Sequence, residues 1–274
     1  MIKISSKTKG AELTSIKFNN EEKLHNGIDF WQRQSPILFP IVGQLKNGKT
    51  IINNNEYEMS QHGFARDMEF EVIGENSYVL KSSEKTFEKY PYNFELYVNY
   101  ESSEDTVKTT YKVKNSDNKE IIFGLGAHPA YKCDYSSGEY YLEFEKEEND
   151  TVKVIMLENG LVSENEIDTT RFFKTTTRFE LNKDTFKDDA VILKGLKSNK
   201  VTLYKKEEKI LEFDFTGFNY LAFWSKKDAN FICIEPWFNT ADHIDSNGEF
   251  KTKPNILKLN PGEEFECDYK VKFF

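Results

Sequence analysis

The chain has 274 residues, of which 38% are hydrophobic, 15% aromatic and 30% charged. Its 23 Phe and 14 Tyr residues supply far more buriable surface than a disordered chain carries, so disorder is excluded. Because 46 acidic residues outnumber 37 basic ones and give a net charge of −9, the composition also argues against binding of nucleic acid through a basic surface.

Alternation of apolar and polar residues predicts strands along much of the chain. Only eight residues are Ala, and the many aromatics favour strands over helices. Val107–Lys114 and Phe265–Phe273 each place apolar side chains on one face and charged or polar side chains on the other, as half-buried strands do. The predicted strands are 94–100, 107–114, 140–145, 151–157, 201–204, 209–215, 220–225, 231–235 and 265–273.

The segments between these strands are turns rather than helices. Asn-, Gly- and Pro-containing turns occur at 115–118, 136–138, 158–160, 246–248 and 261–262, and no helix of three or more turns is predicted. Short strands without interleaved helices indicate an all-β, antiparallel sandwich or barrel. No linker or shift in composition divides the chain, so one domain over residues 1–274 is expected.

The cysteines and the N-terminal segment indicate in which cellular compartment the protein is expected. Cys133, Cys233 and Cys267 are widely spaced and odd in number, which argues against a disulfide framework. The N-terminus lacks the apolar core of a signal peptide, and no apolar run is long enough to cross a bilayer. We expect a reduced, cytoplasmic protein without a membrane partner.

Four segments depart from the alternating pattern. The run 35–44 is apolar and bracketed by prolines, whereas 61–67 concentrates His, Gly, Arg and Asp. Segment 124–131 places a histidine before a proline, and 235–237 ends an apolar strand with Glu-Pro-Trp. Such residues at strand ends are candidates for a functional site.

Two histidines and one glutamate in these segments could perform chemistry. Glu235 follows an apolar strand, and a buried carboxylate must be paired, protonated or functional. His62 and His128 serve equally well as structural hydrogen-bonding residues or as proton donors and acceptors. The other histidines, His25 and His243, lie in polar surroundings and are expected at the surface.

These residue types suit two reaction classes. General acid–base catalysis needs titratable groups on either side of a substrate. A metal site would use the same residue types, but the HxH and HExxH spacings are absent, so none is expected. A nucleophile elbow and a phosphate-binding loop are absent too. The nearby aromatics, which either form a sugar platform or pack in the core, are Phe64, Tyr131, Trp224 and Trp237.

In order and spacing, segments 35–44, 61–67, 126–131 and 235–237, together with the ending 257–265, resemble the aldose 1-epimerases (galactose mutarotases). The similarity is greatest to the divergent bacterial branch often encoded near lactose or galactose genes. The resemblance implies a large twisted antiparallel β-sandwich, the galactose mutarotase-like supersandwich, with the sugar bound in a cleft across one sheet.

The resemblance also implies roles for individual residues. Glu235 matches the general base and His128 the general acid, and His62 matches a second histidine that binds the ring oxygen or a hydroxyl. Asp189, with Asp188 as a rival, matches an aspartate that binds sugar hydroxyls.

Further binding residues follow from the same comparison. The family tends to carry an arginine where this chain has Gln44, and Arg33 or Arg66 would then replace that contact. Tyr131, Trp224 and Trp237 complete the expected substrate-binding residues.

The activity implied is isomerisation of a free aldohexose such as galactose or glucose by acid–base ring opening and closure, with no cofactor and no metal. The protein would be a monomer or a homodimer. Two alternatives stay open: a hexose 6-phosphate as substrate, which the presence of only four arginines disfavours, and a non-catalytic sugar-binding or regulatory protein.

Overall fold

The computed structural model describes residues 1–148, 152–167 and 169–274. Within them almost all regular structure is β-strand, and the strands pair antiparallel, so the all-β class and the β-sandwich are confirmed. The one α-helix in the described part, α1 (Glu84–Phe87), makes a single turn, and no described helix could cross a membrane. One-turn 3₁₀ helices lie at 46–48, 65–67, 135–137, 169–171 and 250–252.

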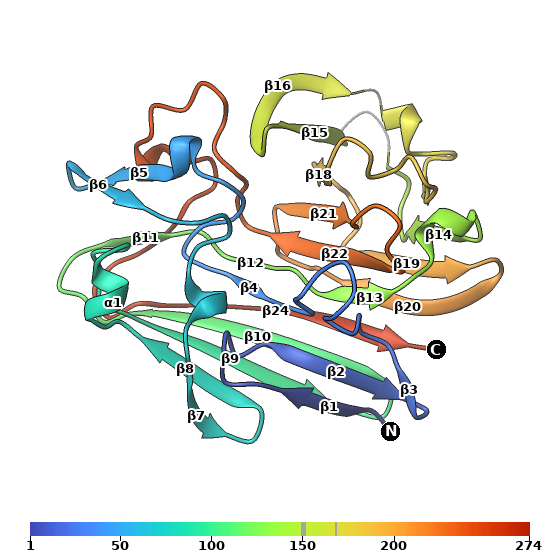
Figure 1. Ribbon diagram of the computed structural model, residues 1–274, viewed down its shortest axis with the longest axis horizontal. Coiled ribbons are helices and arrows are strands. Elements are labelled where there is room, and N and C mark those ends of the chain that lie inside the picture. The colour runs from blue at the N-terminus through green and yellow to red at the C-terminus, as the bar shows by residue number, and fades with distance from the viewer. Residues whose placement is uncertain (149–151, 168) are drawn as a thin grey trace.

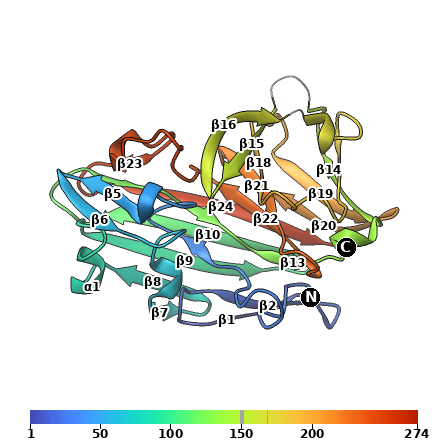
Figure 2. The ribbon, with the colours of Figure 1, turned by 45° about the horizontal axis from the view of Figure 1, so that its top comes forward.

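Two large sheets dominate the molecule (Figures 1 and 2). The nine-stranded sheet has the order β17 (Arg178–Glu180), β14 (Tyr140–Phe144), β19 (Lys200–Lys205), β20 (Glu208–Asp214), β24 (Glu264–Phe273), β10 (Thr106–Asn115), β9 (Phe94–Ser102), β8 (Ser77–Lys81), β7 (Glu71–Gly74). The eight-stranded sheet has the order β16 (Leu161–Ile167), β15 (Lys153–Glu158), β18 (Val191–Lys194), β21 (Tyr220–Trp224), β22 (Phe231–Trp237), β12 (Gly126–Ala127), β4 (Ile37–Leu38), with β13 (Ala130–Lys132) also paired to β22.

Three small sheets complete the fold. They are β1 (Lys3–Ser6) with β2 (Leu13–Phe18) and β3 (Glu21–Glu22); β5 (Lys49–Ile52) with β6 (Asn55–Glu58); and β11 (Ile121–Phe123) with β23 (Leu257–Leu259). The strands that precede residue 94 are short or irregular, which is why alternation did not predict them. The predicted strand 151–157 corresponds to β15, and Thr151 lies outside the described residues.

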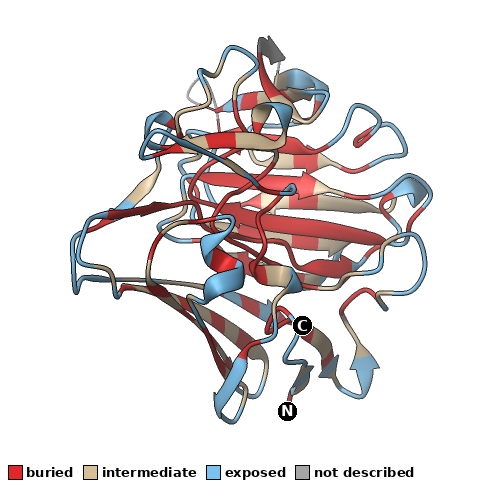
Figure 3. Cartoon of the chain, turned by 60° about the vertical axis from the view of Figure 1, so that its left-hand side comes forward, coloured by how far each residue is buried: buried red, intermediate tan, exposed pale blue. Residues whose placement is uncertain are grey.

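The two large sheets differ in how they are buried (Figure 3). Along β10 buried and half-buried residues alternate strictly, so one face of the nine-stranded sheet contacts the core and the other contacts solvent. Strand β22 is buried at every position. Ile232 and Ile234 join the main core, whereas Cys233, Glu235 and Trp237 lie on the opposite face. That second face is covered by loops, and it carries the polar groups.

Candidate functional site

The centre of the site is a carboxylate and an imidazole on neighbouring chain segments. Strands β12 and β13 both pair with β22 in the same register, and His128 and Pro129 lie between them. Pro129 accepts a hydrogen bond from the Ile234 amide through its carbonyl oxygen, so the segment stays aligned with β22 although the strand is interrupted. This register sets His128 across from Glu235, and the two side chains share a face. His128 Nε2 lies 3.3 Å from Glu235 Oε2.

A tight turn brings the second histidine to the pair. His62 and Gly63 both have left-handed backbone angles, with φ of 66° and 74°. A side chain at Gly63 would collide with the carbonyl oxygen of Phe39, so only glycine permits this approach. The Gly43 amide donates a hydrogen bond to His62 Nδ1 at 3.1 Å, which assigns the ring proton of neutral His62 to Nε2. The His62 and His128 ring centroids are 5.4 Å apart.

Burial controls the protonation of all three groups. Glu235 is fully buried, and burial raises the pKa of its carboxyl group well above the usual value. Burial, assisted by the charges of Arg66 and Arg33, lowers the pKa of His128 to about 3. The pKa of His62 is also lowered well below its usual value, first by burial and then by His128 and the two arginines. Burial therefore shifts all three groups toward their uncharged forms.

These side chains lie in one cavity of about 420 Å³, within the range of about 300–1,000 Å³ typical of small-molecule sites. Its walls combine aromatic, apolar and polar groups. The lining residues are Trp31, Gly43, Gln61, His62, Arg66, His128, Leu157, Gly160, Asp189, Ala190, Ile192, Trp224, Lys226, Glu235, Trp237 and Ala241.

Several buried polar atoms in this wall lack a hydrogen-bond partner among the described residues. They are Glu235 Oε1, His128 Nδ1, Trp237 Nε1 and Arg66 Nε, whereas Glu235 Oε2 has only its contact of 3.3 Å with His128 Nε2. An unpaired buried polar atom costs about 1–3 kcal/mol, and folded proteins rarely leave such atoms together. Their concentration in one cavity is what a site for a polar ligand requires.

Most of the sequence-predicted residues meet in this cavity. Besides Glu235, His128 and His62, the lining includes Arg66, Asp189, Trp224 and Trp237. Of the two rival aspartates, Asp189 lines the cavity. The other, Asp188, forms an ion pair of 2.7 Å with Arg171 and does not line it.

Three predicted binding residues lie elsewhere. Tyr131 was expected to contact the ligand, but its ring is buried in the core against Phe213, so this prediction is wrong. Gln44 is not among the described lining residues; its side-chain oxygen lies against Gly160, which does line the cavity. Arg33 lies in an adjacent cavity and pairs with Asp67 at 2.9 Å.

Of the two alternatives left open for Phe64 the core one holds, and the expectation for His25 is wrong. The ring of Phe64 packs in the core, at 6.3 Å from the ring of Phe39, rather than in the site. His25 was expected at the surface, but it is buried against Phe231, and its Nε2 donates to the carbonyl oxygen of Trp31 at 2.8 Å. Polar neighbours in sequence did not reveal this burial, because the covering side chains come from distant segments.

Among the lining residues that sequence reasoning did not assign to the site, three have aromatic or polar side chains. Trp31 comes from the loop between β3 and β4, Gln61 precedes the His62 turn, and Lys226 follows β21. A tryptophan within the polar stretch 25–34 was the one available signal, since an exposed loop rarely carries such a large apolar side chain without a contact.

Three potential metal ligands that form no recognisable motif in the sequence lie close together in the structure. The ligating atoms of His128, Cys233 and Glu235 all lie within 4.8 Å of one another, close enough to hold a metal ion. Cys233 and Glu235 share one face of β22, and His128 arrives from the neighbouring segment. The expected absence of a metal, which rested on motif spacing alone, therefore stays a prediction to be tested.

Comparison with known proteins points to one family. Residues 2–266 match the aldose 1-epimerase family. The chain is 32% identical to protein LacX of Lactococcus lactis subsp. lactis, over 98% of this chain and 95% of that protein. It is also similar to the solved structure of a galactose mutarotase related enzyme from Lactobacillus acidophilus, with 30% identity, a TM-score of 0.90 and coverage of 100% of this chain and 95% of that one.

Two other solved structures share the fold. A galactose mutarotase-like protein from Lactobacillus casei is 28% identical, with a TM-score of 0.92 and coverage of 100% of this chain and 97% of that one. A galactose 1-epimerase from Lactobacillus acidophilus is 12% identical, with a TM-score of 0.72 and coverage of 100% and 91%, respectively. At that lower identity the similarity concerns the fold alone.

Proposed function

We propose that this chain, which belongs to the aldose 1-epimerase family, is an isomerase. It would interconvert the α and β anomers of an aldose. The observation that carries the proposal is the contact of 3.3 Å between His128 and Glu235 in a cavity lined by unpaired polar atoms. The minimal substrate is an aldohexose such as galactose or glucose.

The reaction needs one proton removed and one supplied. Glu235 takes the proton of the C1 hydroxyl, a C1=O double bond forms, and the bond between C1 and the ring oxygen breaks. His128 gives its proton to that ring oxygen. Rotation about C1–C2 and closure on the other face of the aldehyde, with the two groups in exchanged roles, yields the other anomer. Proton transfer by a positioned group contributes about 10²–10⁴-fold.

The pair can hold the single proton that this cycle needs. Burial favours a protonated Glu235 and a neutral His128, which together carry the same number of protons as a carboxylate and an imidazolium. A sugar hydroxyl that donates to Glu235 stabilises the carboxylate form and opposes the effect of burial. Substrate binding thus shifts the shared proton toward His128, from which it reaches the ring oxygen.

The rest of the wall positions the ring. His62 Nε2 is the protonated nitrogen and donates to a sugar oxygen. Trp224 and Trp237 offer flat apolar surface to the C–H face of the sugar, while Asp189 and Arg66 are available to its hydroxyls. None of these steps requires a cofactor.

Anomer exchange, measured by NMR on the purified protein, tests this proposal. Glu235→Gln keeps the shape of the side chain but cannot accept a proton, so kcat should fall about 10²-fold or more while sugar affinity by calorimetry is largely kept. Glu266→Gln, at an exposed position of β24, is the matched control and should exchange anomers normally. A folded Glu235→Gln protein with near wild-type exchange would overturn the assignment. Wild-type protein that binds sugar without exchange would instead indicate a non-catalytic binder.

A further inference from the structure

A second cavity adjoins the one that holds Glu235. It too measures about 420 Å³, and the two cavities share Trp31 and Arg66 as common walls. Three segments that are distant in sequence line it: the β1–β2 turn, the loop between β3 and β4, and the 3₁₀ turn 65–67. The lining residues are Lys7, Lys9, Glu12, Phe30, Trp31, Gln32, Arg33, Arg66 and Asp67.

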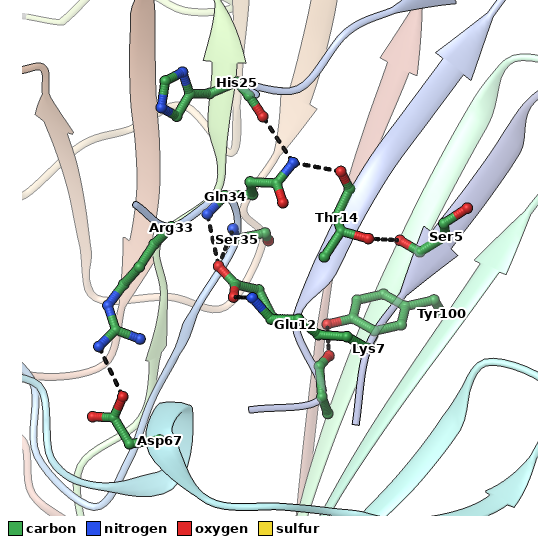
Figure 4. Close-up of polar contacts among 11 residues, drawn as sticks. Ser5, Lys7, Glu12, Thr14, His25, Arg33, Gln34, Ser35, Asp67 and Tyr100 are labelled. Atoms are coloured by element: carbon green, nitrogen blue, oxygen red, sulfur yellow. Dashed lines mark hydrogen bonds and ion pairs between the residues drawn. The ribbon is translucent and has the colours of Figure 1, made fainter. Parts of the chain in front are cut away.

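The carboxylates in this wall are already neutralised (Figure 4). Glu12 is buried, forms an ion pair of 2.5 Å with Lys7, and accepts hydrogen bonds from the amides of Gln34 and Ser35 at 2.7 and 3.1 Å. Asp67 forms its ion pair with Arg33 (Figure 4).

Two cations of the wall are left without such a partner. Neither Lys9 nor Arg66 forms an ion pair with a carboxylate among the described residues. Arg66 is partly buried, and its Nη2 donates to the carbonyl oxygen of Gln61, whereas its buried Nε finds no described partner. Burial lowers the pKa of Arg66 to about 10, so its side chain stays charged at neutral pH. Arg66 thus lies partly buried between two cavities; the charges of Asp67 and Glu12 act on it, but it forms no ion pair among the described residues, and such a cation is suited to an anion.

The wall is held in place by backbone contacts. The Gly10 amide donates to the carbonyl oxygen of Met68 at 2.7 Å, and an added Cβ at Gly10, whose φ is 70°, would lie 2.6 Å from the carbonyl oxygen of Arg66. The β1–β2 turn therefore packs directly on the segment that carries Arg66. A pre-formed set of cations loses little conformational entropy when it binds an anion.

The position of this cavity relates it to one part of the sugar. His128 is the group proposed for the ring oxygen, and Trp31, which lines both cavities, stacks on His128 with the ring centroids 4.8 Å apart. In an aldohexose, C5 is bonded to the ring oxygen and carries C6. A substituent on C6 therefore lies on the same side of the ring as the oxygen that His128 protonates.

We propose that the second cavity receives an anionic group on C6 of the aldose, so that the preferred substrate is an acidic sugar such as an aldohexose 6-phosphate. This inference rests on the proposed epimerase function and specifies its substrate class. A phosphate monoester and a uronic acid carboxylate present the same chemistry to Arg66, Lys9 and Arg33. The phosphate offers more acceptor oxygens to these cations.

The test compares anomer exchange of galactose, galactose 6-phosphate, galacturonate and lactose by the wild-type protein. We expect kcat/KM for galactose 6-phosphate to exceed that for galactose about tenfold or more, the effect of one or two charge-assisted hydrogen bonds. A higher kcat/KM for galacturonate than for galactose and galactose 6-phosphate would support the anion site and identify a carboxylate as its ligand. Equal rates for galactose and its 6-phosphate, or a preference for lactose, would overturn the proposal.

Two charge-reversal variants test whether the preference for the 6-phosphate depends on the second cavity. Lys9→Glu should lower kcat/KM for galactose 6-phosphate about tenfold and leave that for galactose unchanged. Lys3→Glu, at an exposed position of β1 outside the cavity, is the control for net charge and should change neither. Equal effects of the two variants would contradict the proposed site.

Binding separates this inference from the proposed function. In the Glu235→Gln protein, calorimetry should still show tighter binding of galactose 6-phosphate than of galactose. If the wild-type protein exchanges no sugar but this preference persists, the epimerase assignment fails and the anion site stands. If both sugars are exchanged and this preference is absent, the anion site fails alone.

Discussion

The indole ring of Trp31 stacks on the imidazole ring of His128, with the ring centroids 4.8 Å apart and the planes 30° from parallel. The loop that carries Trp31 is anchored on both sides. His25 donates to the carbonyl oxygen of Trp31, and Lys226 Nζ donates to that of Phe30 at 3.0 Å. A segment to which no proton transfer is assigned thus covers His128, the proposed general acid, and limits the rotation of its ring.

We expect Trp31 to act as a positioning residue. Trp31→Ala should lower kcat/KM for anomer exchange about tenfold, because a misplaced general acid loses its alignment with the ring oxygen. Trp31→Phe keeps a stacking surface and should recover most of that loss. Thermal unfolding of both variants separates positioning from folding. A folded Trp31→Ala protein with wild-type kcat/KM would show that the stacking is dispensable.

The pH profile of kcat/KM should be a broad bell. Because the pKa of Glu235 is raised and that of His128 is lowered to about 3, the pair holds one proton over the range between these two steps. The acid limb reflects the uptake of a second proton and should lie below about pH 5. The alkaline limb reflects the loss of the only proton and should lie well above 4.5. Limbs at 4.5 and 6.5, the usual values of these groups, would contradict this interpretation.

The buried carboxyl group should make stability depend on pH. Because the folded-state pKa of Glu235 is raised, its stabilising contribution is fully present below the unfolded-state pKa and is lost as pH rises toward the folded one. The loss is at most about 1.4 kcal/mol per pH unit. Glutamine does not ionise, so the Tm of Glu235→Gln minus that of the wild type should grow between about pH 5 and pH 8. Glu266→Gln should show no such trend, and a pH-independent difference for Glu235→Gln would contradict the burial argument.

Chelation decides between acid–base and metal chemistry at the site. We expect exhaustive EDTA treatment to leave anomer exchange unchanged, because a proton donor and a proton acceptor suffice for the reaction. Cys233→Ala offers an independent check. It removes one atom of the His128, Cys233 and Glu235 group and should leave kcat nearly unchanged. Activity lost on chelation or in Cys233→Ala, and restored by zinc or manganese in the wild type, would favour a metal site.

The candidate site was only partly predictable from the sequence. The residues at strand ends, His128 before Pro129 and Glu235 after an apolar run, were identified because their chemistry is unusual for those positions. Tyr131 was misassigned because a residue next to a site in sequence can point to the other face of its strand. Trp31, His25 and the wall shared by the two cavities depend on loops whose paths no local pattern specifies.

The sequence by itself determined the fold class and the chemical character of the site. Strict alternation in β9, β10 and β24 specifies strands with one buried face, since a shift of one residue would expose every apolar side chain. Only the tertiary structure decided that His128 lies 3.3 Å from Glu235, because this distance depends on the register between β22 and segments a hundred residues away in sequence. It likewise decided which charges pair. The ion pairs of Lys7 with Glu12 and of Arg33 with Asp67 depend on how three distant loops pack, and Arg66, between the two cavities, forms no ion pair among the described residues.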